Sequence, residues 1–399
     1  MTGLTQFVRL VSSMRNPFTP GSGLFPPYFA DREREVREFR QRLLSTIEGK
    51  PRHLAVLGEW ATGKTSLLIQ LRRLAREEGA LATLSVANPE ETQAFIGSLI
   101  RTLSLEVQAA YGESLWKRLA KAVGLQAVSL SALGASLEFR FASAGEAQLS
   151  LREYLRSLWE QLRDPGCVPA VLIAIDDLDL IPDFRQTMVL LRNTAMELGL
   201  TGAKVMIVVA GTPVLFEKMW EAHAPLVRFF EPLELGCLPE EAAREAVTKP
   251  LEGSGVRFEP EVVERIARLS QGQPYYLQEL AYHAFETAQD GVATLETFAL
   301  AFERAFSTIA KTVFERRVAG LSAGEQKLLG VVATLEGPAT HGEIVARAVQ
   351  AGLKKGSVPK LLQRLKEKGC VRQVETGPQK GRYFLEDPLF AEYVRRRAV

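Results

Sequence analysis

One short motif, Gly58 to Thr65, constrains the fold of this chain more than any other part of the sequence. It matches the phosphate-binding pattern G-x-x-x-x-G-K-[ST]. The glycines let the backbone curl so that its N–H groups surround a β-phosphate, and the start of the following helix attracts the negative charge. We expect Lys64 to reach the β- and γ-phosphate oxygens and the Thr65 hydroxyl to hold Mg²⁺. An apolar stretch precedes the motif and an amphipathic helix, Ser66 to Glu78, follows it.

A pair of carboxylates ends another apolar stretch, Val171 to Ile175. In sites of this kind a strand delivers an acidic residue that completes the metal shell. We expect Asp176 to hold Mg²⁺ directly or through water and Asp177 to orient and deprotonate the attacking water. Asp179 is expected to cap the following turn. The sequence therefore predicts an ATP and Mg²⁺ site whose loop contacts come from Gly58, Glu59, Trp60, Ala61, Thr62, Gly63, Lys64, Thr65 and Ser66.

Short apolar runs without alternation predict strands that are covered on both faces. They lie at residues 54–57, 81–86, 171–175 and 205–210, with a fifth candidate near Leu233. Helical patterns, such as residues 31–48, alternate with them. This order predicts an α/β fold with a doubly wound parallel sheet.

Composition and charge narrow the class of protein. The chain has 399 residues, 46% hydrophobic and 24% charged, which fits two or three globular domains and excludes disorder. Its three cysteines and four histidines are too dispersed for a disulfide framework or a zinc site. No stretch resembles a signal peptide or a bilayer span, so we expect an intracellular, cytoplasmic protein without a membrane partner.

The expected organisation has four parts. An arm rich in Pro and Gly occupies residues 1–30, and the sheet domain follows at 31–235. A hairpin, Val128–Phe141, is expected within an insertion at about 112–150. The pattern then becomes helical only, as a lid at 236–320. The last part, 321–399, has 14 Lys and Arg against 8 Asp and Glu, which makes it basic on a slightly acidic body.

These motifs resemble those of the AAA+ ATPases, and within them the branch of archaeal origin initiators and STAND signalling ATPases. The resemblance extends from about residue 16 to the end. It implies that the segment with Tyr28 and Arg32 covers the adenine and that Thr212 senses the γ-phosphate. It also implies that Arg228 is an arginine finger, which stabilises charge on a neighbouring subunit's nucleotide. Nucleotide-dependent self-association is therefore expected.

A turn at Gly272 and Pro274 is similar to the G-x-P lid motif of STAND proteins. Pro274 at a helix start fixes φ without losing a useful N–H, so the turn can press on the nucleotide. A classical AAA+ lid would offer an arginine here, and its lack favours a slow switch over a fast motor.

The C-terminal part is predicted to be a winged helix. It has helices at 322–335, after Thr340, and at 357–368, followed by two basic strands with a Gly/Pro-rich tip. Such modules place the third helix in the major groove. A solvated basic face, or a clamp on nucleotide or protein, remains open as an alternative. The residues predicted to contact DNA are Ser357, Lys360, Gln363, Arg364, Lys380 and Arg382.

Together these observations favour an ATP-dependent switch that binds duplex DNA and acts with further subunits or partners. DNA loading, initiation, transposition and regulation all fit. The alternative is a STAND-type signalling or defence ATPase whose partners are proteins. A nucleotide-binding protein without turnover ranks last, because Lys64, Asp176 and Asp177 are all present.

Overall fold

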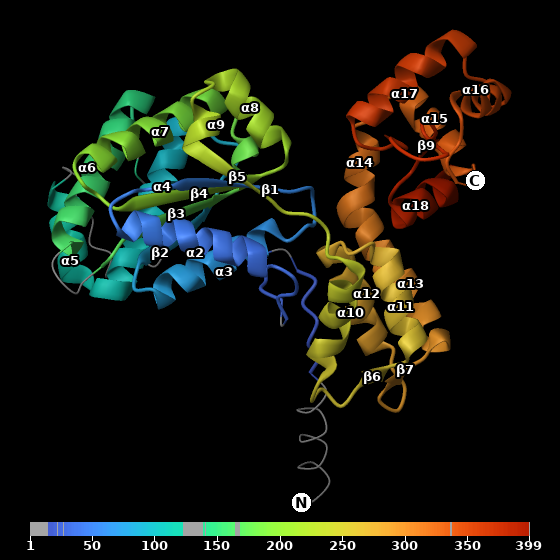
Figure 1. Cartoon of the computed structure of the whole chain (residues 1–399), viewed down its shortest axis with the longest axis horizontal. Helices are drawn as coiled ribbons and strands as arrows, with labels where there is room; N and C mark the ends of the chain where they lie inside the picture. Colours follow the sequence, from blue (N-terminus) through green and yellow to red (C-terminus); the bar gives the residue numbers. More distant parts are fainter. Residues whose placement is uncertain are drawn as a thin grey trace, which may run out of the picture. The chain divides into compact units, whose positions relative to one another are not determined.

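The computed structural model describes residues 15–21, 23–26, 28–122, 139, 141–163, 168–335 and 337–398. They form two compact units (Figure 1). The first, here called the sheet unit, contains residues 21–237. The second, the helical unit, combines residues 15–20 with residues 238–398.

The sheet unit is built on five parallel strands, which confirms the predicted doubly wound α/β fold. Their order across the sheet is β2-β3-β4-β1-β5. The side chains of the three central strands are buried along their whole length, as their continuous apolar sequences predict. The strands are β1 His53–Leu57, β2 Leu81–Val86, β3 Val171–Asp176, β4 Val205–Gly211 and β5 Phe230–Glu234.

Helices cover both faces of this sheet (Figure 1). On one face, α2 (Glu33–Ile47) and α3 (Lys64–Glu77) pack onto the sheet through a core that includes Phe39 and Leu67. The other face carries a larger core, to which α4, α6 and α7 contribute most. Its helices are α4 Thr92–Tyr111, α5 Glu113–Ala122, α6 Ala144–Leu162, α7 Phe184–Leu200, α8 Val214–Ala222 and α9 Leu226–Phe229.

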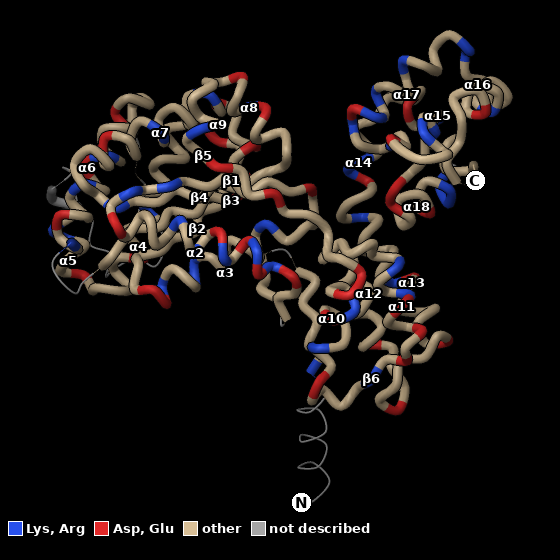
Figure 2. Tube along the Cα trace, in the orientation of Figure 1, with Lys and Arg blue, Asp and Glu red and all other residues tan. Residues whose placement is uncertain are grey.

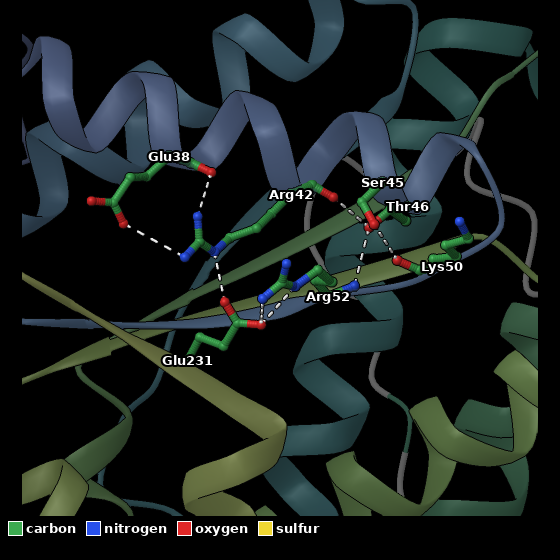
Figure 3. Close-up of polar contacts among 7 residues, drawn as sticks. All are labelled: Glu38, Arg42, Ser45, Thr46, Lys50, Arg52 and Glu231. Atoms are coloured by element: carbon green, nitrogen blue, oxygen red, sulfur yellow. Dashed lines mark hydrogen bonds and ion pairs between the residues drawn. The ribbon is translucent and has the colours of Figure 1, made fainter.

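Ion pairs fix α2 against the edge strand β5 (Figure 3). The carboxylate of Glu231 in β5 accepts hydrogen bonds from Nε of Arg42 at 2.9 Å and from Nε of Arg52 at 2.7 Å. The Thr46 hydroxyl donates to the Arg42 carbonyl and accepts from the Arg52 amide, which closes the turn between α2 and β1. The strand next to the phosphate loop is thereby held at its start.

The helical unit begins with four helices and a small sheet. The sequence predicted helices only, and this was wrong in one detail: β6 (Arg257–Phe258) pairs in parallel with β7 (Val292–Ala293). Strands of two residues show no periodicity that a sequence could reveal. The helices are α10 Glu240–Thr248, α11 Pro260–Ser270, α12 Pro274–Glu286 and α13 Leu295–Ile309, followed by a π-helical turn at Ala310–Phe314 and α14 Glu315–Ala319.

The described part of the N-terminal arm packs on these helices. The Asn16 side chain donates to the Tyr282 carbonyl at 3.1 Å, and the Thr19 amide donates to Gln278 at 2.9 Å. Phe18 is buried and stacks on Phe258. Residues 15–20 therefore belong to the helical unit although they precede the sheet unit in sequence.

The C-terminal domain, residues 321–398, has the predicted order of three helices and an antiparallel pair of strands. A further helix, α18, ends the chain where the sequence predicted only the strands. It packs on the earlier helices of the same unit, and just before it the Asp387 carboxylate accepts a hydrogen bond from the Tyr276 hydroxyl of α12 at 2.9 Å. The elements are α15 Ala323–Ala333, α16 His341–Gln350, α17 Val358–Glu367, β8 Arg372–Gln373, β9 Tyr383–Phe384 and α18 Pro388–Ala398.

The predicted hairpin, Val128–Phe141, lies almost wholly outside the described residues. Only Phe139 and Phe141 are described, and both pack against the larger core. None of the described helices is long and apolar enough to cross a lipid bilayer.

Candidate nucleotide-binding site

The phosphate loop connects the end of β1 to the start of α3 in the sheet unit. Gly63, the N-cap of α3, has φ of +90°, and Ala61 has φ of +69°. A Cβ on Gly58 would lie 2.6 Å from the Thr62 hydroxyl, so only glycine allows this close turn. The motif therefore folds as a tight loop that leads directly into the first turn of α3. The free backbone N–H groups of a helix start form an anion-binding site.

Lys64 lies folded onto the loop that it is expected to complete. Its ammonium donates to the carbonyls of Gly58 at 2.9 Å and Glu59 at 3.0 Å, and the residue is only 8% exposed. Burial lowers the pKa of Lys64, and the nearby carboxylates of Asp176 and Asp177 oppose that effect. A triphosphate would offer this ammonium stronger, charged acceptors than two carbonyls.

Thr65 and Asp176, the two predicted Mg²⁺ ligands, are brought together. The Thr65 hydroxyl donates to Asp176 Oδ2 at 2.5 Å, and Asp176 is 1% exposed at the end of β3. A hydroxyl and a carboxylate are hard oxygen donors of the kind that Mg²⁺ prefers. The residues present therefore fit the ion, which would be held by Thr65 and Asp176 together with the phosphates.

Asp177 leaves the strand in the left-handed region, with φ of 54°. Its amide donates to Asp176 Oδ1 at 3.0 Å, so the backbone at Asp177 binds the neighbouring carboxylate. Burial and then the charge of Asp176 raise the pKa of Asp177, with a smaller contribution from Asp179. A carboxylate with a raised pKa next to a phosphate loop is suited to accept a proton from water.

The sequence suggested that Asp179 caps the following turn, and this expectation was wrong. Oδ2 of Asp179 accepts hydrogen bonds from the Thr212 hydroxyl at 2.6 Å and from the Thr212 amide at 3.2 Å. Asp179 follows β3 and Thr212 follows β4, which are neighbours in the sheet. The residue predicted to sense the γ-phosphate is therefore already bonded to an acidic side chain.

Arg32 contacts the loop from its backbone side. The guanidinium donates to the carbonyls of Thr62 at 3.3 Å and Gly236 at 2.7 Å, and Arg32 is 6% exposed. Tyr28, predicted from the same segment, is half-buried. These contacts indicate that Arg32 stabilises the loop through a backbone carbonyl, whereas its expected contact with adenine stays a prediction.

Other predicted loop contacts differ in exposure. Trp60 is 57% exposed, and the Lys64 ammonium lies 5.9 Å from its ring centre. Glu59 is exposed as well, whereas Thr62 is buried and its hydroxyl donates to the Glu59 carbonyl at 2.8 Å. The Ser66 hydroxyl donates to the Leu24 carbonyl at 3.2 Å.

The remaining predicted residues lie on other elements. Arg228 is exposed on the short helix α9 of the sheet unit. Gly272 and Pro274 belong to the helical unit, where Pro274 begins α12 and Gly272 has φ of +70°. A Cβ on Gly272 would lie 1.9 Å from the Leu238 carbonyl oxygen, so this turn packs tightly on the chain that enters the unit.

The residues predicted to contact DNA lie in the C-terminal domain. Lys360, Gln363 and Arg364 are exposed on α17, and Lys380 is exposed between β8 and β9. Two others have local partners: the Ser357 hydroxyl donates to the Lys354 carbonyl, and Arg382 donates to the Pro338 carbonyl at 3.3 Å. Arg382 therefore connects the segment before β9 to the segment before α16.

The fold and the site together define an ATPase of the P-loop class. Residues 28–208 match the family model described as AAA ATPase domain, so the chain carries such a domain and is an ATPase. No curated protein sequence matches the chain significantly.

Solved structures with a similar fold cover nearly the whole chain. The Walker-type ATPase of Pyrococcus abyssi is 16% identical with a TM-score of 0.57, over 92% of this chain and 96% of that one. The ORC2 protein of Aeropyrum pernix in its ADPNP–ADP complexes is 16% identical with a TM-score of 0.63, over 95% and 96%. Its ADP form gives 14%, 0.52, 95% and 98%. At these identities the likeness concerns the fold.

Proposed function

We propose that this protein is an ATP-dependent switch that binds duplex DNA through its C-terminal domain and acts together with further subunits. The proposal combines two parts of the chain. The sheet unit supplies the nucleotide site, and the C-terminal domain, which we infer to be a winged helix, supplies a basic surface.

Hydrolysis would depend on four side chains. Lys64 would bind the β- and γ-phosphate oxygens, and Mg²⁺ bound by Thr65 and Asp176 would neutralise phosphate charge. Asp177 would accept a proton from water as the water oxygen forms a bond to the γ-phosphorus. The bond from that phosphorus to the β–γ bridging oxygen breaks, and ADP leaves with this oxygen.

Unpaired basic side chains on the C-terminal domain carry the DNA proposal. Figure 2 marks several basic segments along α17. Within the described residues, Lys360, Arg364 and Lys380 are exposed and form no ion pair. By contrast, Lys368, which follows α17, is paired with Glu325, and Arg372 of β8 is paired with Glu386. Exposed cations without partners on a third helix and its adjoining strand tip are suited to phosphate contacts.

Fluorescence anisotropy of labelled duplex DNA, at two salt concentrations and with ATP, ADP or no nucleotide, tests this proposal. We expect tight binding that depends on salt and on ATP. Charge reversal of Lys360, Arg364 and Lys380 to Glu should abolish specific binding. It should also flatten the slope of log K against log salt by about 2–3, because each phosphate contact contributes about 0.9.

A matched triple variant controls for net charge. Arg37, Lys50 and Arg101 are exposed on the sheet unit and form no ion pair within the part of the chain that the structure describes. Their reversal to Glu changes the total charge equally and should leave DNA affinity unchanged. Equal DNA affinity in the first triple variant and the unmodified protein would refute the proposed surface.

A STAND-type switch with protein partners is the second candidate. The tight turn at Gly272 and Pro274 favours it, because the family motif lies here in a turn that packs closely on the Leu238 backbone. A nucleotide-dependent change in oligomer size without DNA, measured by light scattering, would support this reading. A monomer under all nucleotides, together with salt-sensitive DNA binding, would exclude it.

Self-association would complete the nucleotide site if Arg228 acts across subunits. Its exposure on α9 leaves the guanidinium accessible to a second copy. Mixing Arg228→Ala protein with Lys64→Ala protein tests this. Each variant alone should be inactive, whereas the mixture should recover turnover, because mixed pairs contain one intact site.

A further inference from the structure

The side chain of Asp179 binds two groups of Thr212 with one oxygen atom. Oδ2 accepts from the Thr212 hydroxyl at 2.6 Å and from the Thr212 amide at 3.2 Å. A hydroxyl has a single proton and two acceptor lone pairs. When the hydroxyl donates its hydrogen bond to a carboxylate, its oxygen can only accept hydrogen bonds from other groups.

The surrounding backbone makes this contact specific. A Cβ on Gly211 would lie 2.7 Å from Asp179 Oδ1, so the carboxylate can approach the end of β4 only because residue 211 is glycine. On the other side, the Lys218 ammonium donates to the Asp179 carbonyl at 2.8 Å. Asp179 is thus held from α8 while it binds the residue that follows β4.

The pair lies beside the phosphate loop. The Gly58 amide, at the start of the loop, donates to the Gly211 carbonyl at 3.2 Å, so Thr212 is one residue from a direct loop contact. Burial and the charge of Asp176 are the main causes of the raised pKa of Asp177, and the charge of Asp179 adds to them. Burial lowers the pKa of Lys64, and Asp179 is one of the carboxylates that oppose this effect.

We propose that Asp179 is a positioning residue. By accepting the hydrogen bond of the Thr212 hydroxyl, it leaves the hydroxyl oxygen to act as an acceptor for the attacking water. One hydrogen of the water would then point to Thr212 and the other to Asp177, which directs the oxygen lone pair toward the γ-phosphorus. Thr212 would not donate to the γ-phosphate. This inference rests on the proposed roles of Lys64 and Asp177.

The two roles of Thr212 predict different kinetics. A donor to the γ-phosphate would improve the binding of ATP over ADP, whereas an acceptor for water would act on turnover alone. The measurements are kcat by phosphate release and the Kd values of ADP and a non-hydrolysable ATP analogue. Thermal unfolding checks that each variant folds.

We expect Thr212→Val and Asp179→Ala to lower kcat by about 10- to 100-fold and to leave the ratio of the two Kd values unchanged. Asp179→Asn should stay within a few-fold of the unmodified protein, because its amide oxygen still accepts both bonds. The double variant of Thr212→Val with Asp179→Ala should be no slower than either single one, since both remove the same interaction.

Opposite outcomes would overturn the inference. If Thr212→Val weakens the ATP analogue relative to ADP, or Asp179→Ala strengthens it, the hydroxyl donates to the γ-phosphate. If Asp179→Ala does not fold, Thr212→Val decides the question together with Thr212→Ser, which keeps the hydroxyl and should keep kcat within a few-fold of the unmodified protein. Failure of the proposed site itself would look different: Lys64→Ala would hydrolyse ATP as fast as the unmodified protein.

Discussion

The guanidinium of Arg32 donates a 2.7 Å hydrogen bond to the carbonyl of Gly236, close to the point where the chain leaves the sheet unit. The same guanidinium donates to Thr62 in the phosphate loop. One buried side chain therefore holds the loop and the outgoing chain in a fixed relation.

Replacing Arg32 by Met should destabilise the sheet unit. The apolar stem is kept, but two carbonyls lose their donor, which costs about 1–3 kcal/mol. Affinity for ATP should weaken too, because Thr62 belongs to the loop. Chemical denaturation and nucleotide titration measure the two effects. Arg37→Met is the control, because Arg37 is exposed on α2, the helix that follows Arg32, and it should change neither quantity.

Asp177→Asn should abolish turnover while nucleotide binding remains. Loss of a general base costs about 10²- to 10⁴-fold in kcat. In the unmodified protein, kcat should fall as pH decreases through the raised pKa of Asp177, because the base must be deprotonated. Phosphate release across pH measures this limb, and a limb that persists in Asp177→Asn would assign it to another group.

The same substitution should raise the melting temperature at neutral pH. Folding raises the pKa of Asp177, so the unfolded chain loses this proton first as pH increases, and the carboxylate then disfavours the folded state. Stability from this group is present below the unfolded pKa and lost as pH rises through the folded one. Asp183→Asn, an exposed neighbour, should leave the melting temperature unchanged.

Glu325 should make the C-terminal domain sensitive to acid. Its carboxylate is 2% exposed, accepts the Ser322 amide at 2.7 Å and binds the Lys368 ammonium at 2.9 Å. The amide of Ser322 and then the ammonium of Lys368 lower the pKa of Glu325 from 4.5 to about 2. The stabilisation is therefore complete above the unfolded pKa and is lost as pH falls through the folded one.

Acid titration followed by circular dichroism tests this expectation. Glu325→Gln should melt earlier at neutral pH and lose less stability between about pH 5 and pH 2 than the unmodified protein. Glu343→Gln is a matched control, because Glu343 closes the same kind of capping box with Thr340 but forms no ion pair with a lysine among the described residues. Equal effects of both substitutions would contradict a contribution from Lys368.

Gly272→Ala should destabilise the helical unit by more than a positive φ alone explains. Gly253 has φ of +78° with no atom within 4 Å of its added Cβ, whereas Gly272 has φ of +70° and meets the Leu238 carbonyl. We expect a cost of about 1 kcal/mol for Gly253→Ala. For Gly272→Ala it should exceed about 2 kcal/mol. Thermal unfolding compares them, and equal costs would show that the chain at Leu238 yields easily.

Much of the fold could be read from local patterns. The apolar runs predicted the strands β1 to β4, because strands covered on both faces are continuously apolar. The edge strand β5 is partly exposed and not continuously apolar, and the sequence offered it only as a candidate near Leu233. The sequence did not predict the two-residue strands β6 and β7 or the helix α18, because these elements depend on packing against distant segments. The predicted hairpin falls outside the described residues.

Local patterns were enough to predict the candidate site residues Lys64, Thr65, Asp176 and Asp177, because a loop motif and a strand end are both features of neighbouring residues. The partners of Asp179 and Arg32 could be found only in the folded chain. Thr212 is 33 residues from Asp179, and Gly236 is 204 residues from Arg32. Such pairings depend on which strands are neighbours, and strand order is set by the packing of the whole sheet.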